Sequence, residues 1–285
     1  MRTPAEKAAA FRALHERPGC FIIPNPWDAG TARLLAALRF EALATTSLGV
    51  ANVLGRADST VSREEVIANA REIAQATDLP VTADLENCFA HAPAAAAETI
   101  RLAADAGLAG GSIEDFTGDR AAPIYDFDLA VERVRAAVAV VRSLPLPFML
   151  TARAENLIRG RSDMADTIRR LQAYAAAGAD VLYAPGLKTA AEIRAVVEAI
   201  DRPLNVVTGW LDPDMTAADV AAAGAKRISV GGGLNRLALA AFLGAAQAMK
   251  DEGSFAWMRD MAGTGPLREM FATGGPVETE RMDIR

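Results

Sequence analysis

Short apolar runs that end in polar or small residues alternate with longer, alanine-rich amphipathic segments along most of the chain. The alternation recurs eight times, and the apolar runs are expected as strands over residues 21–24, 42–46, 81–84, 111–114, 148–153, 180–184, 204–208 and 227–230. The intervening segments are expected as helices over residues 29–38, 62–77, 93–106, 126–144, 162–177, 189–200, 216–223 and 234–251. Eight such units in series predict an α/β fold, a (β/α)8 barrel of the TIM type. The alternative is a doubly wound open sheet, although eight evenly spaced units fit a closed barrel better.

Signals at the helix ends support these boundaries. Gly107, Gly178 and Gly224 each follow a helical segment and are expected to adopt the left-handed conformation that ends a helix. Ser62 is followed three residues later by Glu65, which predicts a capping box at a helix start. His15 falls in the amphipathic segment at the N-terminus and is expected at the surface.

Composition excludes several classes of protein. The formal net charge is −6, with 30 Lys and Arg against 36 Asp and Glu and no basic block, which argues against a nucleic-acid partner. No apolar run approaches the length of about 18 residues that a membrane span needs. The first 18 residues are charged rather than apolar, so no export signal is expected. Two cysteines make no disulfide framework and fit a reducing cytoplasm.

The sequence after the eighth unit is unexpectedly apolar. We expect a barrel with an N-terminal helix over residues 1–252 and a C-terminal helical arm and tail over residues 253–285, of which 274–285 are polar and expected to fray. The apolar side chains of the arm are Trp257, Met258, Met261, Met270 and Phe271. A closed barrel has no unfilled core for them, so the arm either folds back on its own barrel or packs on a second subunit. We expect the second arrangement, in a homodimer or a tetramer.

Acidic residues follow three successive expected strands. Asp84 and Glu86 end the third, and their spacing would place both on the same side of an extended chain. Glu114 ends the fourth, and Arg153 ends the fifth. Carboxylates that converge at one end of a barrel repel each other unless a cation neutralises them, and an all-oxygen set suits Mg²⁺ or Mn²⁺. The alternative is that these acids cap helices and pair with Arg153.

These strand ends carry a family resemblance. Over residues 20–250 the chain resembles the isocitrate lyase/phosphoenolpyruvate mutase superfamily, and in particular the 2-methylisocitrate lyases. The motifs, in order, are Asn-Pro-Trp-Asp (25–28), Thr-Thr-Ser-Leu-Gly (45–49), Leu-Gly-Arg-Ala-Asp (54–58), Thr-Ala-Asp-Leu-Glu-Asn (82–87), Ser-Ile-Glu-Asp (112–115) and Thr-Ala-Arg-Ala-Glu (151–155). The resemblance implies a Mg²⁺-dependent enzyme that makes or breaks a C–C or P–C bond next to a 2-oxo carboxylate. It also implies a tetramer whose C-terminal helices are swapped between subunits.

The resemblance further implies a metal site and a substrate turn. Asp84 resembles the direct metal ligand, and Glu86 and Glu114 resemble acids that hold the metal through water. Many members have Asp where this chain has Glu86. The turn formed by Thr46, Ser47 and Leu48 resembles the one that binds the substrate carboxylate.

Three further residues take their implied roles from the same resemblance. Arg153 resembles the arginine that neutralises the 2-oxo acid and its developing enolate, a role for which a bidentate guanidinium is suited. Asp58 resembles an acid that faces the reacting carbon, although it could instead cap the helix that begins near Ser62. Asn205 resembles an amide that lines the pocket, although it could instead be a turn residue at a strand end.

The loop after the fourth strand departs from the superfamily. Isocitrate and 2-methylisocitrate lyases carry Lys-Lys-Cys-Gly-His there, whereas residues 115–126 contain no Cys or His. A retro-aldol lyase of the isocitrate type is therefore disfavoured, and Asp58 or a water on the metal would have to move the proton. Phosphonate mutases have lysines and an asparagine in this loop, whereas this chain has Phe116, Arg120 and Ala122.

We therefore expect a Mg²⁺-dependent carbon–carbon lyase, decarboxylase or hydrolase that acts through an enolate. Its first candidate substrates are small 2-oxo or 2-hydroxy acids that resemble oxaloacetate or malate. Two alternatives stay open. One is mutase or hydrolase chemistry on phosphonopyruvate or phosphoenolpyruvate, and the other is a catalytically silent protein that only binds a 2-oxo acid.

Overall fold

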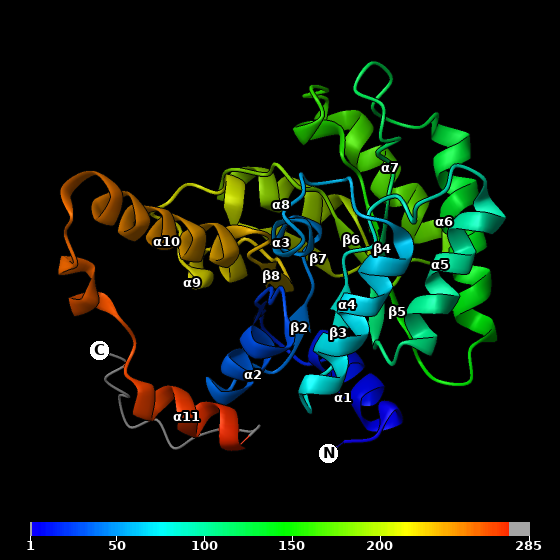
Figure 1. The fold of residues 1–285 in the computed structure, drawn as a ribbon. Coiled ribbons are helices and arrows are strands. Elements are labelled where there is room, and N and C mark those ends of the chain that lie inside the picture. Colours follow the sequence, from blue (N-terminus) through cyan, green and yellow to red (C-terminus); the bar gives the residue numbers. More distant parts are fainter. Residues whose placement is uncertain (1, 274–285) are drawn as a thin grey trace.

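Eight short parallel strands form the centre of the fold in the computed structural model, which describes residues 2–273 (Figure 1). The strands are β1 (Phe21–Ile23), β2 (Leu43–Ala44), β3 (Val81–Ala83), β4 (Gly110–Glu114), β5 (Met149–Arg153), β6 (Val181–Tyr183), β7 (Leu204–Val207) and β8 (Arg227–Ser229). They are hydrogen-bonded in the order β1-β8-β7-β6-β5-β4-β3-β2. The Ala44 N–H also donates to the Pro24 carbonyl at 3.0 Å, which links β2 to the end of β1. The sheet is therefore a nearly closed barrel, as the eight repeats predict, and not an open sheet.

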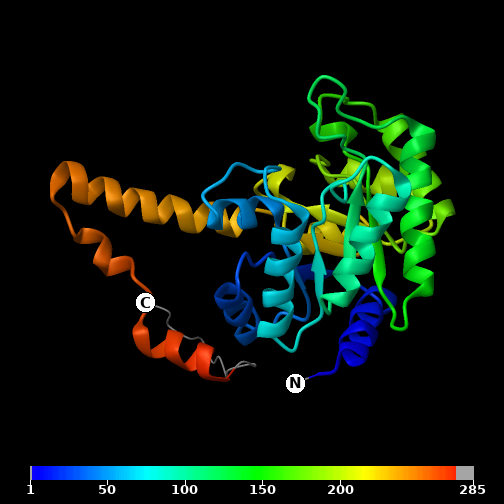
Figure 2. The same ribbon diagram turned by 45° about the vertical axis from the view of Figure 1, so that its right-hand side comes forward.

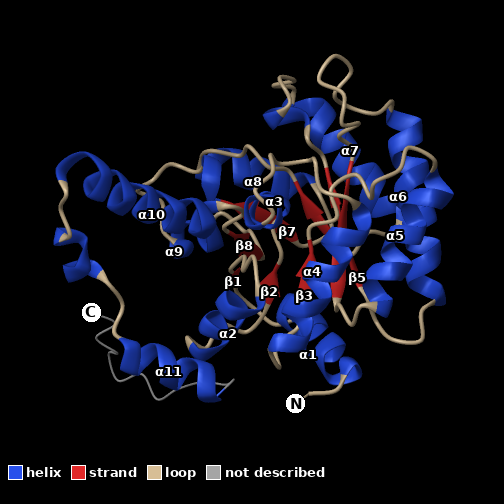
Figure 3. Cartoon of the chain, viewed as in Figure 1, coloured by secondary structure: helices blue, strands red, loops and turns tan. Residues whose placement is uncertain are grey.

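Helices surround this ring of strands (Figure 3). The α-helices are α1 (Pro4–Glu16), α2 (Ala29–Ala37), α3 (Ser47–Val53), α4 (Arg63–Ala76), α5 (Pro93–Asp105), α6 (Phe127–Ser143), α7 (Met164–Ala177), α8 (Ala190–Ala199), α9 (Ala217–Ala222), α10 (Gly233–Glu252) and α11 (Thr264–Thr273). Three short 3-10 helices are η1 (Asn156–Ile158), η2 (Thr208–Trp210) and η3 (Ala256–Asp260). The sequence pattern does not predict α3, which is short and lies in the turn directly after β2.

The predicted helix ends are confirmed. Ser62 Oγ accepts from the Glu65 N–H at 3.3 Å, and a Glu65 carboxylate oxygen accepts from the Ser62 N–H at 2.9 Å. Gly178 has φ +107° directly after α7, and a Cβ there would lie 2.9 Å from Cγ1 of the branched side chain of Val138. Both the backbone conformation and the close approach therefore require glycine at this helix end.

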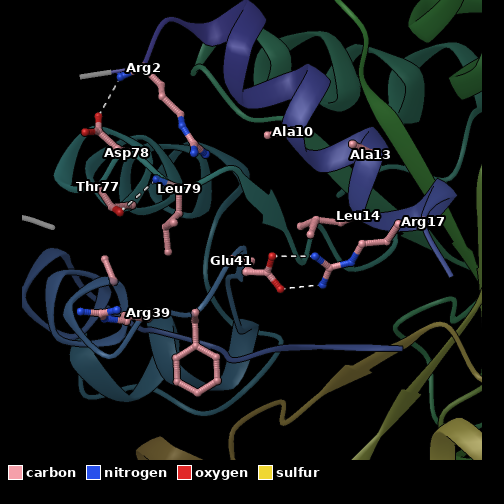
Figure 4. Close-up of a pocket in the computed structure, with 12 residues that line it drawn as sticks. Arg2, Ala10, Ala13, Leu14, Arg17, Arg39, Glu41, Thr77, Asp78 and Leu79 are labelled. Atoms are coloured by element: carbon pink, nitrogen blue, oxygen red, sulfur yellow. Dashed lines mark hydrogen bonds and ion pairs between the residues drawn. The ribbon is translucent and has the colours of Figure 1, made fainter. Parts of the chain in front are cut away.

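Helix α1 packs across the amino-terminal end of the barrel, where Phe11 and Leu14 are buried against Phe21 and Val181. A cavity of about 660 Å³ lies beside it, between α1 and the segment that follows α2 (Figure 4). At its edge the Arg17 guanidinium donates two hydrogen bonds to the Glu41 carboxylate, at 2.7 and 2.6 Å. This cavity is at the opposite end of the barrel from the carboxyl ends of the strands, where TIM barrels hold their active sites.

The expected surface position of His15 is wrong. The side chain is only 7% exposed, because α1 lies against the barrel and the imidazole points inward between the rings of Phe11 and Phe21. His15 Nδ1 lies 2.9 Å from the Phe11 carbonyl, and Nε2 lies 3.4 Å from the guanidinium of Arg227. Burial, with a smaller contribution from Arg227, lowers the pKa of His15 to about 3.

This burial predicts an acid-dependent loss of stability. Below pH 6.5 the unfolded chain gains a proton on His15 that the folded chain resists, so the free energy of unfolding falls by about 1.4 kcal/mol for each pH unit. Between about pH 7 and pH 5 the contribution is about 2 kcal/mol. We expect the free energy of unfolding, measured with urea, to fall by about 2 kcal/mol less between pH 7 and pH 5 in His15→Gln than in wild type. His91→Gln, which removes the other histidine of the chain, serves as the control for the loss of an imidazole. A His15→Gln variant with the wild-type slope would contradict this account.

The C-terminal elements leave the barrel. Figure 2 shows α10 projecting away from it, with α11 returning beneath to lie against α2. Along α10 the apolar side chains of Leu237, Phe242 and Leu243 are 68%, 66% and 62% exposed. Met270 of α11 is buried against Ala37 of α2 in the same chain. Residues 274–285 lie outside the described residues, and within residues 2–273 no helix is long and apolar enough to cross a membrane.

Candidate active site

A cavity of about 500 Å³ opens at the carboxyl ends of the strands. It is lined by every residue for which the sequence predicts a role in the site: Thr46, Ser47, Leu48, Asp58, Asp84, Glu86, Glu114, Arg153 and Asn205. These residues come from six different strand ends and loops. They meet because the carboxyl ends of parallel strands in a barrel all face the same way.

Asp84 follows β3 and is fixed from three directions. Its backbone N–H donates to Thr45 Oγ1 at 3.0 Å. One carboxylate oxygen accepts from the Ser47 N–H at 3.1 Å, and the other accepts from Arg153 Nη1 at 2.9 Å. The carboxylate is therefore held between the turn after β2 and the end of β5.

Arg153 is the centre of the charged network. Besides Asp84, its guanidinium lies 3.1 Å from a Glu114 oxygen and 2.9 Å from a Glu155 oxygen, and it stacks over the Tyr183 ring at 4.9 Å. Burial disfavours its charged form, but Glu114, Glu155 and Asp84 outweigh this and raise the pKa of Arg153. Arg153 is therefore a permanent cation in contact with three carboxylates.

Glu86 reaches the cavity by a different route from the one expected. The strand ends at Ala83 and the chain then turns, with Glu86 in the left-handed region at φ +49°. The expected extended path from Asp84 to Glu86 is therefore wrong, although both side chains line the cavity. A left-handed residue other than glycine costs of the order of 1–3 kcal/mol, and such strain is typically retained where function needs the geometry.

Two side chains with no predicted role support the cavity. Arg133, buried in α6, donates hydrogen bonds to backbone carbonyls of residues 87, 90 and 91 and so holds the turn that carries Glu86. Asn25 accepts from the N–H groups of Val230 and Gly231 at 2.9 Å each, and its amide donates to the Thr45 carbonyl at 2.9 Å. The sequence signal for Arg133 is a charge on the otherwise apolar face of a helix, and Asn25 stands in the first family motif.

Three carboxyl groups in the cavity hold their protons more tightly than usual. Burial, reinforced by Asp84, raises the pKa of Glu86 to about 7. Burial and Asp84 also raise the pKa of Asp58. Burial raises the pKa of Glu114 well above its usual range although Arg153 opposes it. The cause in each case is a carboxylate removed from water beside other carboxylates.

The donor chemistry of this cavity fits a hard divalent cation. Asp84, Glu86 and Glu114 present only oxygen atoms, which Mg²⁺ and Mn²⁺ prefer. Within the described part of the chain, no three Asp, Glu, His or Cys side chains lie close enough to hold one ion directly.

Asp58 does not cap a helix and Asn205 is not a turn residue, so the structure excludes both alternative roles. Helix α4 is capped by Ser62 and not by Asp58, whose carboxylate accepts from the neighbouring Ser59 N–H at 3.1 Å. Asn205 lies within β7 and is no turn residue. Its carbonyl oxygen accepts from Arg227 Nε at 2.7 Å, and its amide donates to Ser229 Oγ at 3.0 Å.

The loop that departs from the superfamily forms a small hairpin above the barrel. Phe116 and Ile124 make an antiparallel bridge, and the Thr117 N–H donates to the Pro123 carbonyl at 2.9 Å. Thr117 Oγ1 also donates to the Ala122 carbonyl at 2.7 Å. Arg120 is exposed at the tip of this hairpin and does not line the cavity.

Comparison with known proteins extends over nearly the whole chain. The phosphoenolpyruvate phosphomutase family model matches residues 11–250. An oxaloacetate decarboxylase from Bradyrhizobium diazoefficiens is 30% identical over 237 residues, which cover 78% of this chain and 80% of the relative. A Burkholderia cenocepacia J2315 protein of known structure, provisionally assigned as a lyase or mutase, is 53% identical with a TM-score of 0.93, covering 96% of this chain and 99% of the other.

A structure of oxaloacetate acetylhydrolase in complex with its product oxalate is also similar. It is 26% identical with a TM-score of 0.83, and the match covers 95% of this chain and 94% of the other. The barrel, the acidic cavity with Arg153 at its centre and these matches agree with one another. The chain therefore belongs to the phosphoenolpyruvate phosphomutase family, in the isocitrate lyase/phosphoenolpyruvate mutase superfamily, which includes carbon–carbon lyases.

Proposed function

We propose that the protein is a Mg²⁺- or Mn²⁺-dependent lyase, decarboxylase or hydrolase that cleaves a C–C bond next to a 2-oxo carboxylate through an enolate. The first candidate substrates are small diacids that resemble oxaloacetate or malate. The observation that carries the proposal is the contact of one buried guanidinium, Arg153, with both Asp84 and Glu114 in a cavity lined by further acids. The oxaloacetate decarboxylase and oxaloacetate acetylhydrolase among the similar proteins support the substrate class.

Residues of three strand ends would bind and orient the substrate. Thr46, Ser47 and Leu48 present a hydroxyl and backbone N–H groups to the substrate carboxylate. Arg153 donates two hydrogen bonds toward the 2-oxo group, where negative charge develops as the enolate forms. Asn205 fixes the floor of the cavity through its bonds to Arg227 and Ser229.

Asp84 would hold the cation directly, with Glu86 and Glu114 acting through water. When bound, the cation supplies positive charge that stabilises the enolate oxygen. Asp58, whose pKa is raised by burial and by Asp84, carries the proton to or from the reacting carbon. Glu114 belongs to the catalytic group because it shares Arg153 with Asp84.

Two assays test this proposal together. Wild type and Asp84→Ala are compared by calorimetric titration with Mg²⁺, and by turnover of oxaloacetate, 2-methylisocitrate, isocitrate and phosphonopyruvate. We expect Mg²⁺ affinity to fall at least about tenfold in the variant, and turnover of a C4 diacid to be lost. Equal Mg²⁺ affinity in the two proteins would overturn the metal assignment, and turnover of isocitrate alone would overturn the argument from the hairpin loop.

The second candidate function is mutase or hydrolase chemistry on a phosphonate, which the phosphoenolpyruvate phosphomutase family match favours. Against it, the loop offers only Arg120 for a phosphoryl group, and this side chain is exposed away from the cavity. Turnover of phosphonopyruvate in the assay would establish this function. If the protein binds oxalate but turns over none of the four acids, it is a catalytically silent protein that only binds a 2-oxo acid.

The cellular location belongs to the same proposal. Cys20 and Cys88 are both free thiols, and Cys88 is buried. Unpaired buried cysteines are typical of a reducing compartment. We therefore propose a cytoplasmic location.

A further inference from the structure

A line of polar side chains crosses the floor of the cavity from β8 to β6. Arg227 Nε donates to Asn205 Oδ1 at 2.7 Å, and Asn205 Nδ2 donates to Ser229 Oγ at 3.0 Å. The Ser229 hydroxyl in turn hydrogen-bonds to the hydroxyl of Tyr183. All four side chains line the cavity, and the proposed chemistry gives Tyr183 no role.

Arg227 fixes the direction of the bonds in this network. A guanidinium has only N–H donors, so the amide oxygen of Asn205 must face Arg227 and the amide nitrogen must face Ser229. Ser229 Oγ accepts that bond, which leaves its own proton for Tyr183. Burial raises the pKa of Tyr183, and both Arg153 and the bond from Ser229 oppose the rise, as expected when the phenolic oxygen accepts. The proton of Tyr183 is therefore left for a further acceptor.

The charge of Arg227 gives the floor of the cavity a positive end. The residue is only 5% exposed. Besides Asn205, its guanidinium contacts Thr151 Oγ1 at 3.1 Å and His15 Nε2 at 3.4 Å, and both of these groups are neutral. Burial lowers the pKa of Arg227 to about 10, so the side chain is still a cation at neutral pH. A buried cation that contacts only neutral groups binds their acceptor atoms strongly, which holds the Asn205 oxygen toward it.

Tyr183 is the last residue of β6 and is half-buried, whereas the two residues before it are fully buried. Because it lines the cavity, its exposed part faces the space that a substrate would occupy. Its ring packs on the guanidinium of Arg153, with Cζ 4.9 Å from the ring centre. Across residues 2–273, no group accepts a hydrogen bond from its hydroxyl. In the ring of strands β6 lies opposite β2, the strand whose following segment carries Asp58.

We propose that the Tyr183 hydroxyl donates a hydrogen bond to the substrate oxygen that Arg153 binds. Arg227, Asn205 and Ser229 are positioning residues that direct this donor. The inference rests on the proposed function and deepens it by adding a catalytic residue. The group recognised is the oxygen at C2 of a 2-oxo acid, on which negative charge grows as the enolate forms.

A neutral donor beside Arg153 matters because carboxylates already take most of the donors of that guanidinium. Asp84, Glu114 and Glu155 each lie within 3.1 Å of its nitrogens. The bond from Tyr183 strengthens as charge grows on the substrate oxygen, so it stabilises the transition state more than the substrate. The phenol keeps its proton throughout, and Asp58 on the other side of the cavity remains the group that exchanges a proton with carbon.

Steady-state kinetics of Tyr183→Phe test the donor, with the acid that wild type turns over in the four-acid assay. We expect kcat to fall about 10- to 100-fold, as for a lost hydrogen bond to a charged oxygen, and KM to change less than about threefold. Oxalate resembles the enolate, and calorimetry should show that it binds the Mg²⁺-loaded variant at least about tenfold more weakly. Tyr125→Phe is the matched control and should change none of these quantities. The Tyr125 hydroxyl lies 2.6 Å from His91 Nδ1, and Tyr125 does not line the cavity.

A double-mutant cycle tests the positioning network. Ser229→Ala should lower kcat about 3- to 10-fold in the wild-type background, because Tyr183 then loses the bond that directs it. In the Tyr183→Phe background the same substitution should have no further effect, since Ser229 acts through Tyr183. Equal losses in the two backgrounds would overturn the positioning role of Ser229.

The outcomes separate this inference from the proposed function. Wild-type kcat and oxalate affinity in Tyr183→Phe would overturn the inference and leave the enolate chemistry intact. A raised KM with unchanged kcat would also overturn it, because the bond would then be equally strong in the substrate and the transition state. A loss of the same size in Tyr125→Phe would have the same consequence. If wild type neither turns over any of the four acids nor binds oxalate, the proposed function itself fails.

Discussion

Replacing Arg153 with alanine is expected to lower kcat/KM by at least about 10³-fold. The guanidinium contacts Asp84, Glu114 and Glu155, and its side chain is only 12% exposed. Its removal takes away the donors for the enolate and leaves three carboxylates without their shared cation. The second effect should also lower the free energy of unfolding by about 3–5 kcal/mol.

Arg153→Lys separates these two effects. Lysine keeps the positive charge but cannot donate two parallel hydrogen bonds, so we expect stability to recover substantially while kcat/KM stays about 10²-fold below wild type. Urea unfolding and steady-state kinetics on the same preparations give both quantities. Wild-type kcat in Arg153→Lys would contradict a bidentate role at the enolate.

Removing the C-terminal arm is expected to reduce the size of the assembly. We propose a homodimer at least, and a tetramer as the resemblance implies, in which the projecting α10 and residues 253–263 pack on another copy while α11 stays on α2 of its own chain. In the single chain Phe242, Leu243, Phe255 and Met258 are 66%, 62%, 57% and 52% exposed. Burying each such side chain stabilises a protein by about 1.5–3 kcal/mol. Exposure of these four side chains to water is therefore unfavourable, and packing against another copy would remove it.

Two variants and a control test the arm by light scattering. Truncation after Gly253 and the double substitution Phe242→Ser with Leu243→Ser should both lower the assembly mass. Met270→Ala is the matched control, because Met270 packs on Ala37 of its own chain and should leave the mass unchanged. Wild-type mass in both variants would show that another surface, or none, joins the subunits.

The sequence by itself predicted the barrel, its helix caps and the residues that line the cavity. Strand and helix periodicities are local, so eight alternating units were visible without any knowledge of contacts. Asp84, Glu114 and Arg153 could be assigned to one cavity for a related reason. In a parallel barrel every strand presents its carboxyl end at the same side, so position at a strand end is sufficient to bring these residues together.

The tertiary structure alone decided how several of these residues are held. Glu86 lies in a left-handed turn because Arg133, from a helix more than forty positions away in sequence, binds the carbonyls of that turn. His15 is buried because α1 packs on the barrel beside Arg227, and α11 returns to α2 after α10 has left the barrel. The guanidinium of Arg159 is placed at the cavity wall by Glu155, Glu114 and the Phe116 ring. All of these positions depend on contacts between distant segments, whose energies exceed local conformational preferences and leave no periodic trace in the sequence.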